Sequence, residues 1–169
     1  FDYIGMNASV AKKIDEILKL DEMADTTSKA ELADHTIAFE HVTFSYGEEQ
    51  PVLKDVSFTV PDGKVTALAG VSGSGKSTAA SLICRFWDIT EGQICMGGVP
   101  LNQIPLSDLM SQISFVTQNT FLFKKSIRDN IMMGNPEATE EEMMQSAKDA
   151  VCHDFIMRLP KGYDTVIDK

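Results

Sequence analysis

The sequence lacks the features that mark several broad classes of protein. Its 3 cysteines are scattered over 169 residues and form no C-x-x-C pair, so neither a disulfide scaffold nor a zinc ribbon is indicated, and free thiols in a reducing compartment are expected. No apolar run approaches the roughly 20 residues that cross a bilayer, and no secretory signal peptide is recognisable. We therefore expect this chain itself to be soluble.

Basic residues are scarce as well. The chain has 15 Lys and Arg residues against 25 Asp and Glu residues, which gives a formal net charge of -10. A nucleic-acid-binding protein usually carries a basic stripe, so we expect no nucleic-acid partner. Any phosphate ligand must then be held by local groups, against the negative field of the whole chain. The hydrophobic fraction of 43% is ordinary for one globular domain.

The first part of the chain predicts a helix followed by a linker. Apolar residues recur at three- and four-residue spacing over residues 8–22, with charged residues between them, as in an amphipathic helix. Residues 23–34 are polar and small, which is typical of a linker. We interpret residues 1–34 as this helix and linker, and residues 35–169 as the N-terminal part of a globular domain.

The globular part predicts alternating strands and helices. Apolar and polar residues alternate over 42–46 and 56–60, so these segments are expected to pair in a small antiparallel sheet. Two short, mostly apolar segments, 65–69 and 113–116, lack this alternation and are expected to be strands buried on both faces. The other expected elements are a helix over 77–87, a strand and turn over 91–98, a short helix over 107–112, and a helix that begins at the capping box Thr139-Glu-Glu-Glu142.

The segment Gly70-Val-Ser-Gly-Ser-Gly-Lys-Ser-Thr78 matches the P-loop pattern G-x-x-x-x-G-K-[ST]. Its glycines allow a tight turn whose N–H groups point at phosphate oxygens, and the following helix presents its positive end to the same anion. Lys76 adds a point charge for the β- and γ-phosphates, and the Ser77 hydroxyl can ligate Mg²⁺. The alternative is a flexible Gly/Ser linker, but a linker is not expected between a buried strand and an amphipathic helix.

From about residue 36 to residue 169, the chain resembles the ATP-binding domain of ABC transporters, particularly exporters in which membrane and nucleotide domains are fused. Besides the P-loop, the resemblance rests on Val42-Thr-Phe-Ser-Tyr46, Val52-Leu-Lys-Asp-Val-Ser-Phe58 and Ile113-Ser-Phe-Val-Thr-Gln118. The order and spacing of these segments are more specific than the P-loop alone. The resemblance implies an incomplete α/β fold, with a RecA-like P-loop NTPase core, an antiparallel β subdomain and the start of a helical subdomain.

The resemblance also implies ATP and Mg²⁺ as ligands. The nucleotide contacts would come from Tyr46, Gly70, Ser72, Gly73, Ser74, Gly75, Lys76, Ser77 and Thr78. Lys76 and Gln118 would be the catalytic residues, and Ser77 and Gln118 the metal ligands. Tyr46 would stack on adenine, because an aromatic face attracts a flat heterocycle. Without the family, Tyr46 is better interpreted as a strand-end tyrosine that covers the core, and Gln118 as an ordinary polar residue after a strand.

Partners follow from the same resemblance. In this family two nucleotide-binding domains face each other, as a homodimer or heterodimer, and the membrane domain contacts the region after Gln118. Phe121 and Phe123 lie in that region, and docking of the membrane domain and packing in the core are equally open for them. Residues 1–34 would lead out of the membrane domain, although a freestanding cap helix is also open. The parent protein would lie at the cytoplasmic face of the cell membrane, and no transported substrate is indicated.

Groups that hydrolysis requires in this family are missing from the sequence. It contains no Leu-Ser-Gly-Gly signature, no apolar strand that ends in Asp-Glu and no switch histidine. We therefore expect a parent protein that is a Mg²⁺-dependent ATPase powering export, and a chain that binds nucleotide weakly and hydrolyses it negligibly. The ends at Phe1 and Lys169 favour an excerpt from a longer polypeptide. Two other functions are a soluble ABC-type ATPase that acts as an assembly switch, and a P-loop kinase, for which the arginines are too dispersed to form a lid.

Overall fold

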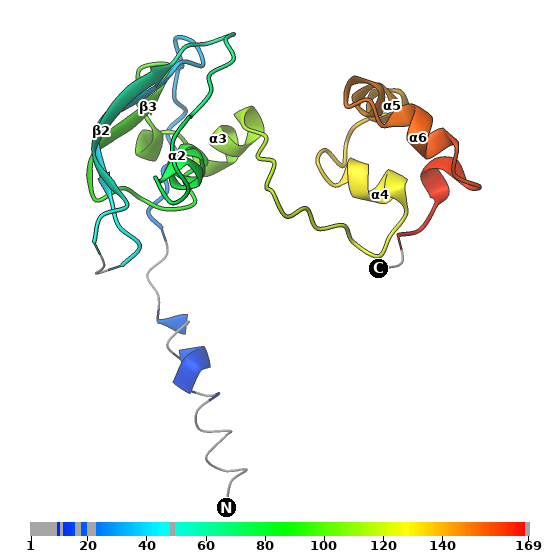
Figure 1. Ribbon diagram of the computed structural model, residues 1–169, viewed down its shortest axis with the longest axis horizontal. Coiled ribbons are helices and arrows are strands. Elements are labelled where there is room, and N and C mark those ends of the chain that lie inside the picture. Colours follow the sequence, from blue (N-terminus) through cyan, green and yellow to red (C-terminus); the bar gives the residue numbers. More distant parts are fainter. Residues whose placement is uncertain (1–9, 11, 16–17, 20–22, 48–49, 168–169) are drawn as a thin grey trace, which may run out of the picture. The chain divides into compact units, whose positions relative to one another are not determined.

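The computed structural model describes residues 10, 12–15, 18–19, 23–47 and 50–167. The chain divides into two compact units, with unit 1 ending at Phe115 and unit 2 beginning at Val116, and each is described by itself (Figure 1). Of the helix predicted over residues 8–22, residues 10, 12–15 and 18 are helical, and the rest of that prediction lies outside the described residues.

Unit 1 contains a four-stranded antiparallel sheet in the order β2-β1-β3-β4. The strands are β1 (Ile37–Phe44), β2 (Leu53–Val60), β3 (Glu91–Met96) and the two-residue β4 (Val99–Pro100). The antiparallel pair predicted around residues 42–46 and 56–60 is confirmed, and so is the strand predicted near 91–98. The fold is therefore mixed α/β, as the sequence predicted.

A bulge in β1 explains why its buried side chains do not alternate evenly. Phe39 and Val42 are both buried although three positions separate them. The register of β1 shifts between these two residues against β2, and between Glu40 and Thr43 against β3. His41 lies at this shift with a φ of 52°, and an extra residue in a bulge turns the following side chains to the other face. The shift lets the first and second halves of β1 bury side chains in the same core.

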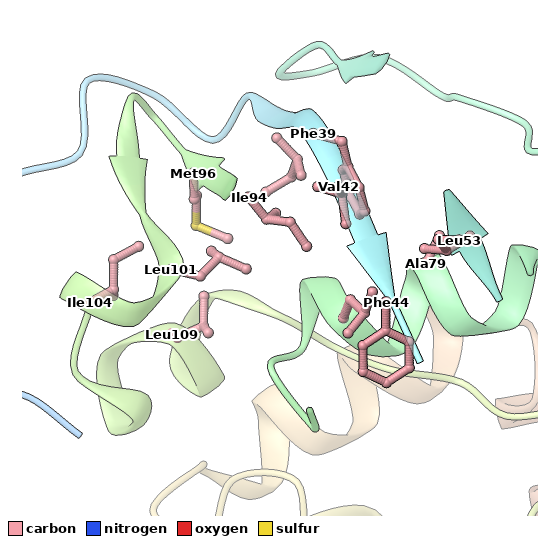
Figure 2. Packing of buried hydrophobic residues seen from close by; sticks show 12 residues of the cluster. Phe39, Val42, Phe44, Leu53, Ala79, Ile94, Met96, Leu101, Ile104 and Leu109 are labelled. Atoms are coloured by element: carbon pink, nitrogen blue, oxygen red, sulfur yellow. The ribbon is translucent and has the colours of Figure 1, made fainter. Parts of the chain in front are cut away.

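The core of unit 1 lies between this sheet and short helices. These are α2 (Lys76–Ile83), the 3₁₀ helix η1 (Leu101–Gln103) and α3 (Leu106–Gln112), so the helices predicted near 77–87 and 107–112 are confirmed. Figure 2 shows the buried side chains gathered between β1 and these helices. The fully buried core positions include Phe39, Val42, Leu82, Ile104 and Leu109.

Segment 23–34, predicted to be a linker, packs on the sheet and helices of unit 1. Ala30 and Leu32 pack against its core, and the backbone N–H of Ala33 donates to the Gly97 carbonyl at 3.2 Å. The Asp25 carboxylate accepts from the backbone N–H of Leu106 at 3.0 Å, at the start of α3. The segment has no helix or strand, as expected, but several of its residues are attached to the folded unit.

Two predicted strands are not formed. Residues 65–69 and 113–116 have no regular secondary structure, and they are not buried, since Val65 is 102% exposed and Val116 is 86% exposed. A strand that is buried on both faces needs neighbouring strands to satisfy its N–H and C=O groups. No strand pairs with either segment within the described part of the chain. The predictions of buried strands here are therefore wrong for this chain.

Unit 2 is helical and has its own small core. Its elements are α4 (Ile127–Met132), α5 (Glu140–Asp149), α6 (His153–Met157) and the 3₁₀ helix η2 (Gly162–Asp164). The capping box predicted at Thr139 is confirmed, with hydrogen bonds in both directions between Thr139 and Glu142. The core residues are Met143, Ala147, Ile156 and Tyr163. Across both units, none of the described helices is long and apolar enough to span a bilayer.

Candidate functional site

The loop that precedes α2 is shaped by two glycines in the left-handed region of φ. Gly73 has a φ of 79° and Gly75, the N-cap of α2, has a φ of 85°. A Cβ at Gly75 would lie 2.6 Å from Leu53 Cδ2 and 3.3 Å from the Val52 carbonyl oxygen. Two features therefore favour glycine at position 75: its left-handed backbone conformation and the close approach of the start of β2.

The loop and the first turn of α2 enclose a small concavity of about 260 Å³. It is lined by Val52, Gly73, Ser74, Gly75, Lys76, Ser77 and Thr78. The N–H groups in the first turn of a helix have no acceptor within that helix, and the helix dipole makes this end positive. The concavity is therefore suited to an anion such as a phosphate group.

Lys76 places its charge at this loop. Its Nζ donates to the carbonyl oxygens of Gly70 at 3.0 Å and Val71 at 2.7 Å, and to Ser74 Oγ at 3.3 Å. These three contacts tie the start of the loop to the first residue of α2. The ammonium group thus lies beside the concavity, as a P-loop lysine should, although the chain as a whole is negative.

Tyr46 lies next to the same helix. Its hydroxyl donates to Thr78 Oγ1 at 3.2 Å. Its ring meets Phe44 at a centroid distance of 4.8 Å and Trp87 at 5.3 Å, both nearly perpendicular. Tyr46 contacts a core residue, as the simpler interpretation held, yet 39% of it stays exposed, so part of the residue is accessible to a nucleobase.

Of the residues predicted for the site, those from Gly73 to Thr78 line the concavity. Tyr46 bonds to Thr78, and the Gly70 carbonyl accepts from Lys76. Ser72 is exposed in the same loop and does not line the concavity. Gln118 belongs to unit 2, where it is exposed in a bend. Its role as a metal ligand and catalytic residue stays a prediction.

The two phenylalanines after Gln118 are exposed. Phe121 is 77% exposed and Phe123 is 45% exposed, and their rings contact each other at 5.0 Å in a perpendicular arrangement. Of the two interpretations open for these rings, packing in the core finds no support in unit 2. An exposed aromatic pair is the kind of surface that a partner covers.

Sequence reasoning missed two neighbours of the site. Val52 lines the concavity, and Trp87 contacts the ring of Tyr46. Neither belongs to the loop motif, so spacing alone could not have found them. The run of aromatic residues directly after α2, Phe86 and Trp87, was the available signal.

A glycine-rich loop followed by Gly-Lys-Ser at the start of a helix is the pattern of P-loop nucleotide-binding proteins. The family model for ABC transporters matches residues 53–165. The chain therefore belongs to the ABC transporter family.

Relatives and solved structures agree with this assignment. Multidrug export ATP-binding/permease proteins from Staphylococcus aureus strains NCTC 8325 and bovine RF122 are each 43% identical over 138 residues, which cover 81% of this chain and 24% of the relative. A bacterial Atm1-family ABC exporter, whose structure was solved with ATP bound, has a TM-score of 0.86 and 34% identity, over 95% of this chain and 28% of that chain. The chain thus spans about a quarter of the length of these proteins.

Proposed function

We propose that the chain is the ATP-binding part of an ABC exporter and that it binds the triphosphate of ATP at the loop before α2. The observation that carries this proposal is the concavity lined by Gly73–Thr78, with the ammonium of Lys76 held beside it. The match to the ABC transporter family supports the same function.

The residues present fit ATP and Mg²⁺ in the following way. Lys76 and the N–H groups of the loop would hold the β- and γ-phosphates, and Tyr46 would stack on adenine. The Ser77 hydroxyl and the Gln118 carboxamide are oxygen donors of the kind that Mg²⁺ prefers. When bound, Mg²⁺ neutralises phosphate charge and fixes the geometry of the triphosphate.

The export function belongs to a longer protein. We infer that ATP binding joins two such domains, and that hydrolysis separates them and drives transport. The names of the Staphylococcus aureus relatives, which combine an ATP-binding part with a permease, support a membrane domain as partner. We place its contact at the exposed rings of Phe121 and Phe123, on the cytoplasmic face of the membrane. A soluble ATPase without a membrane domain is less favoured, because these relatives are fused to a permease.

Hydrolysis by the 169-residue chain alone is expected to be negligible. The attacking water must be oriented and the charge of the transition state stabilised from several sides. The signature, the Asp-Glu strand end and the switch histidine that do this in the family do not occur in this sequence. Binding without turnover is therefore the activity we propose for the chain as it stands.

Calorimetric titration with Mg-ATP tests the proposal. Loss of a charged donor to phosphate is worth on the order of 10- to 100-fold in affinity, so Lys76→Ala is expected to weaken binding by this factor. Lys64→Ala is the matched control, because it removes the same charge from an exposed residue outside the loop. Absence of saturable binding by the unmodified chain, or equal affinity of the two variants, would refute the proposed site.

A further inference from the structure

The nucleobase side of the proposed site contains an aromatic residue outside the loop motif. We propose that Trp87 is a positioning residue for Tyr46: its ring holds the tyrosine in the orientation in which it receives the base of the nucleotide. The inference rests on the proposed nucleotide site and extends it to a residue that the motif does not include.

Three contacts from different parts of unit 1 define the position of the Tyr46 side chain. Phe44, which is 2% exposed and belongs to the core, meets the ring at 4.8 Å with an interplanar angle of 86°. Trp87 meets it at 5.3 Å and 88°. Thr78 on α2 accepts the hydroxyl hydrogen bond at 3.2 Å. Perpendicular aromatic pairs have a preferred geometry, so the two rings restrain the tilt of Tyr46 while Thr78 fixes its tip.

Trp87 is itself held in place by the residues on either side of it in the chain. Arg85 is buried and has a φ of 51°, and its Nε donates to Asp88 Oδ1 at 3.2 Å. Another guanidinium nitrogen, Nη2, donates to the Ala24 carbonyl. The bond between Arg85 and Asp88 closes the turn that carries Trp87, and Arg85 ties this turn to Ala24, so the backbone at Trp87 is held where its ring contacts Tyr46.

The neighbouring Phe86 shows that this contact is specific to Trp87. The two residues are equally exposed, at 47% and 50%. Phe86, however, contacts Phe115 at 5.4 Å instead of Tyr46. Phe86→Ala is therefore a matched control for Trp87→Ala, because it removes an aromatic ring of similar exposure from the same turn.

The test compares two ligands that share a triphosphate and differ in the base. Isothermal titration of the full chain would measure the affinity for Mg-ATP and for Mg-tripolyphosphate, which has no base to stack. Loss of one aromatic contact corresponds to about a 2- to 10-fold change in affinity. Trp87→Ala is expected to weaken Mg-ATP by this factor and to leave Mg-tripolyphosphate unchanged. Trp87→Phe is expected to restore most of the ATP affinity, and Phe86→Ala to change neither ligand.

A spectroscopic measurement checks the same inference without a substitution. Trp87 is the only tryptophan in the sequence, so intrinsic tryptophan fluorescence reports on this position alone. We expect Mg-ATP to change the emission of Trp87 and Mg-tripolyphosphate to leave it nearly unchanged.

The outcomes separate this inference from the proposed function. If Trp87→Ala leaves Mg-ATP affinity unchanged, or weakens both ligands equally, Trp87 does not position a base-binding residue, although the phosphate site stands. If the unmodified chain binds neither ligand, the nucleotide site itself is refuted, and the role of Trp87 with it.

Discussion

Replacing Gly75 with alanine tests whether the loop before α2 depends on both the backbone conformation and the close packing seen at this glycine. Gly75 has a φ of 85°, and an added Cβ would lie 2.6 Å from Leu53 Cδ2. Gly73 has a similar φ of 79°, but no described atom lies within 4 Å of the Cβ that it would gain. Gly73→Ala therefore measures the stability lost through the backbone conformation alone, and Gly75→Ala adds the stability lost through the steric overlap with Leu53.

The expected magnitudes follow from these two terms. Alanine in the left-handed region costs about 1–2 kcal/mol, and the loss of unfolded-state freedom offsets about 0.4–1 kcal/mol of it. Gly73→Ala should then lower the free energy of unfolding by about 1 kcal/mol. Overpacking against a buried side chain adds about 1–3 kcal/mol. Gly75→Ala should therefore cost about 2–4 kcal/mol.

Urea unfolding followed by tryptophan fluorescence measures these differences in unit 1, because Trp87 is the only tryptophan. The double variant Gly75→Ala/Leu53→Ala provides a second test. Leu53→Ala alone creates a cavity, but it also removes Cδ2, so the two substitutions should couple favourably by about 1 kcal/mol or more. The close packing at Gly75 would be refuted by two results together. Gly75→Ala would lose no more stability than Gly73→Ala, and the effects of Gly75→Ala and Leu53→Ala would be strictly additive in the double variant.

Two further predictions concern the capping box and the thiols. Thr139→Ala should destabilise α5 by about 0.5–2 kcal/mol in urea unfolding followed by circular dichroism. Hydrogen bonds from the Thr139 backbone N–H and hydroxyl lower the pKa of Glu142, so this carboxylate stabilises the fold above its unfolded pKa. That contribution is lost as pH falls through the folded-state pKa, and an undiminished effect of Thr139→Ala below it would contradict the reasoning. Burial raises the pKa of the Cys84 and Cys95 thiols. With Ellman's reagent, the half-buried Cys152 should therefore react first, and the other two thiols only on unfolding. Equal reaction rates of the three thiols would contradict this expectation.

The parts of the fold that the sequence predicted well depend on local signals. The loop at Gly70–Thr78 has its own conformational requirements, and the cap at Thr139 is complete within four residues. The alternation near 56–60 indicated β2, because one face of an antiparallel strand packs on the core. The shift in β1 at His41 was not predictable in the same way, since it depends on the register with both neighbouring strands.

The contacts of Tyr46 show the same limit at the site. The sequence indicated the residue, but its orientation depends on Thr78 and Trp87, which lie 32 and 41 positions further along the chain. No periodicity connects residues at such separations. The family resemblance therefore predicted which side chain would stack on adenine, and the contacts that hold this side chain are seen only in the folded chain.

The failure at residues 65–69 has a consequence for the loop that follows them. An apolar segment becomes a buried strand only where other strands supply hydrogen-bond partners, and Val65 and Leu68 are exposed here. The loop is joined to α2 by the bonds from Lys76 Nζ to the carbonyl oxygens of Gly70 and Val71. Since Lys76 binds the loop and would also supply the charge for phosphate in the proposed site, its replacement should loosen the loop as well as weaken binding. Strand partners for residues 65–69 would therefore be expected to strengthen ATP binding without adding any contact to the nucleotide.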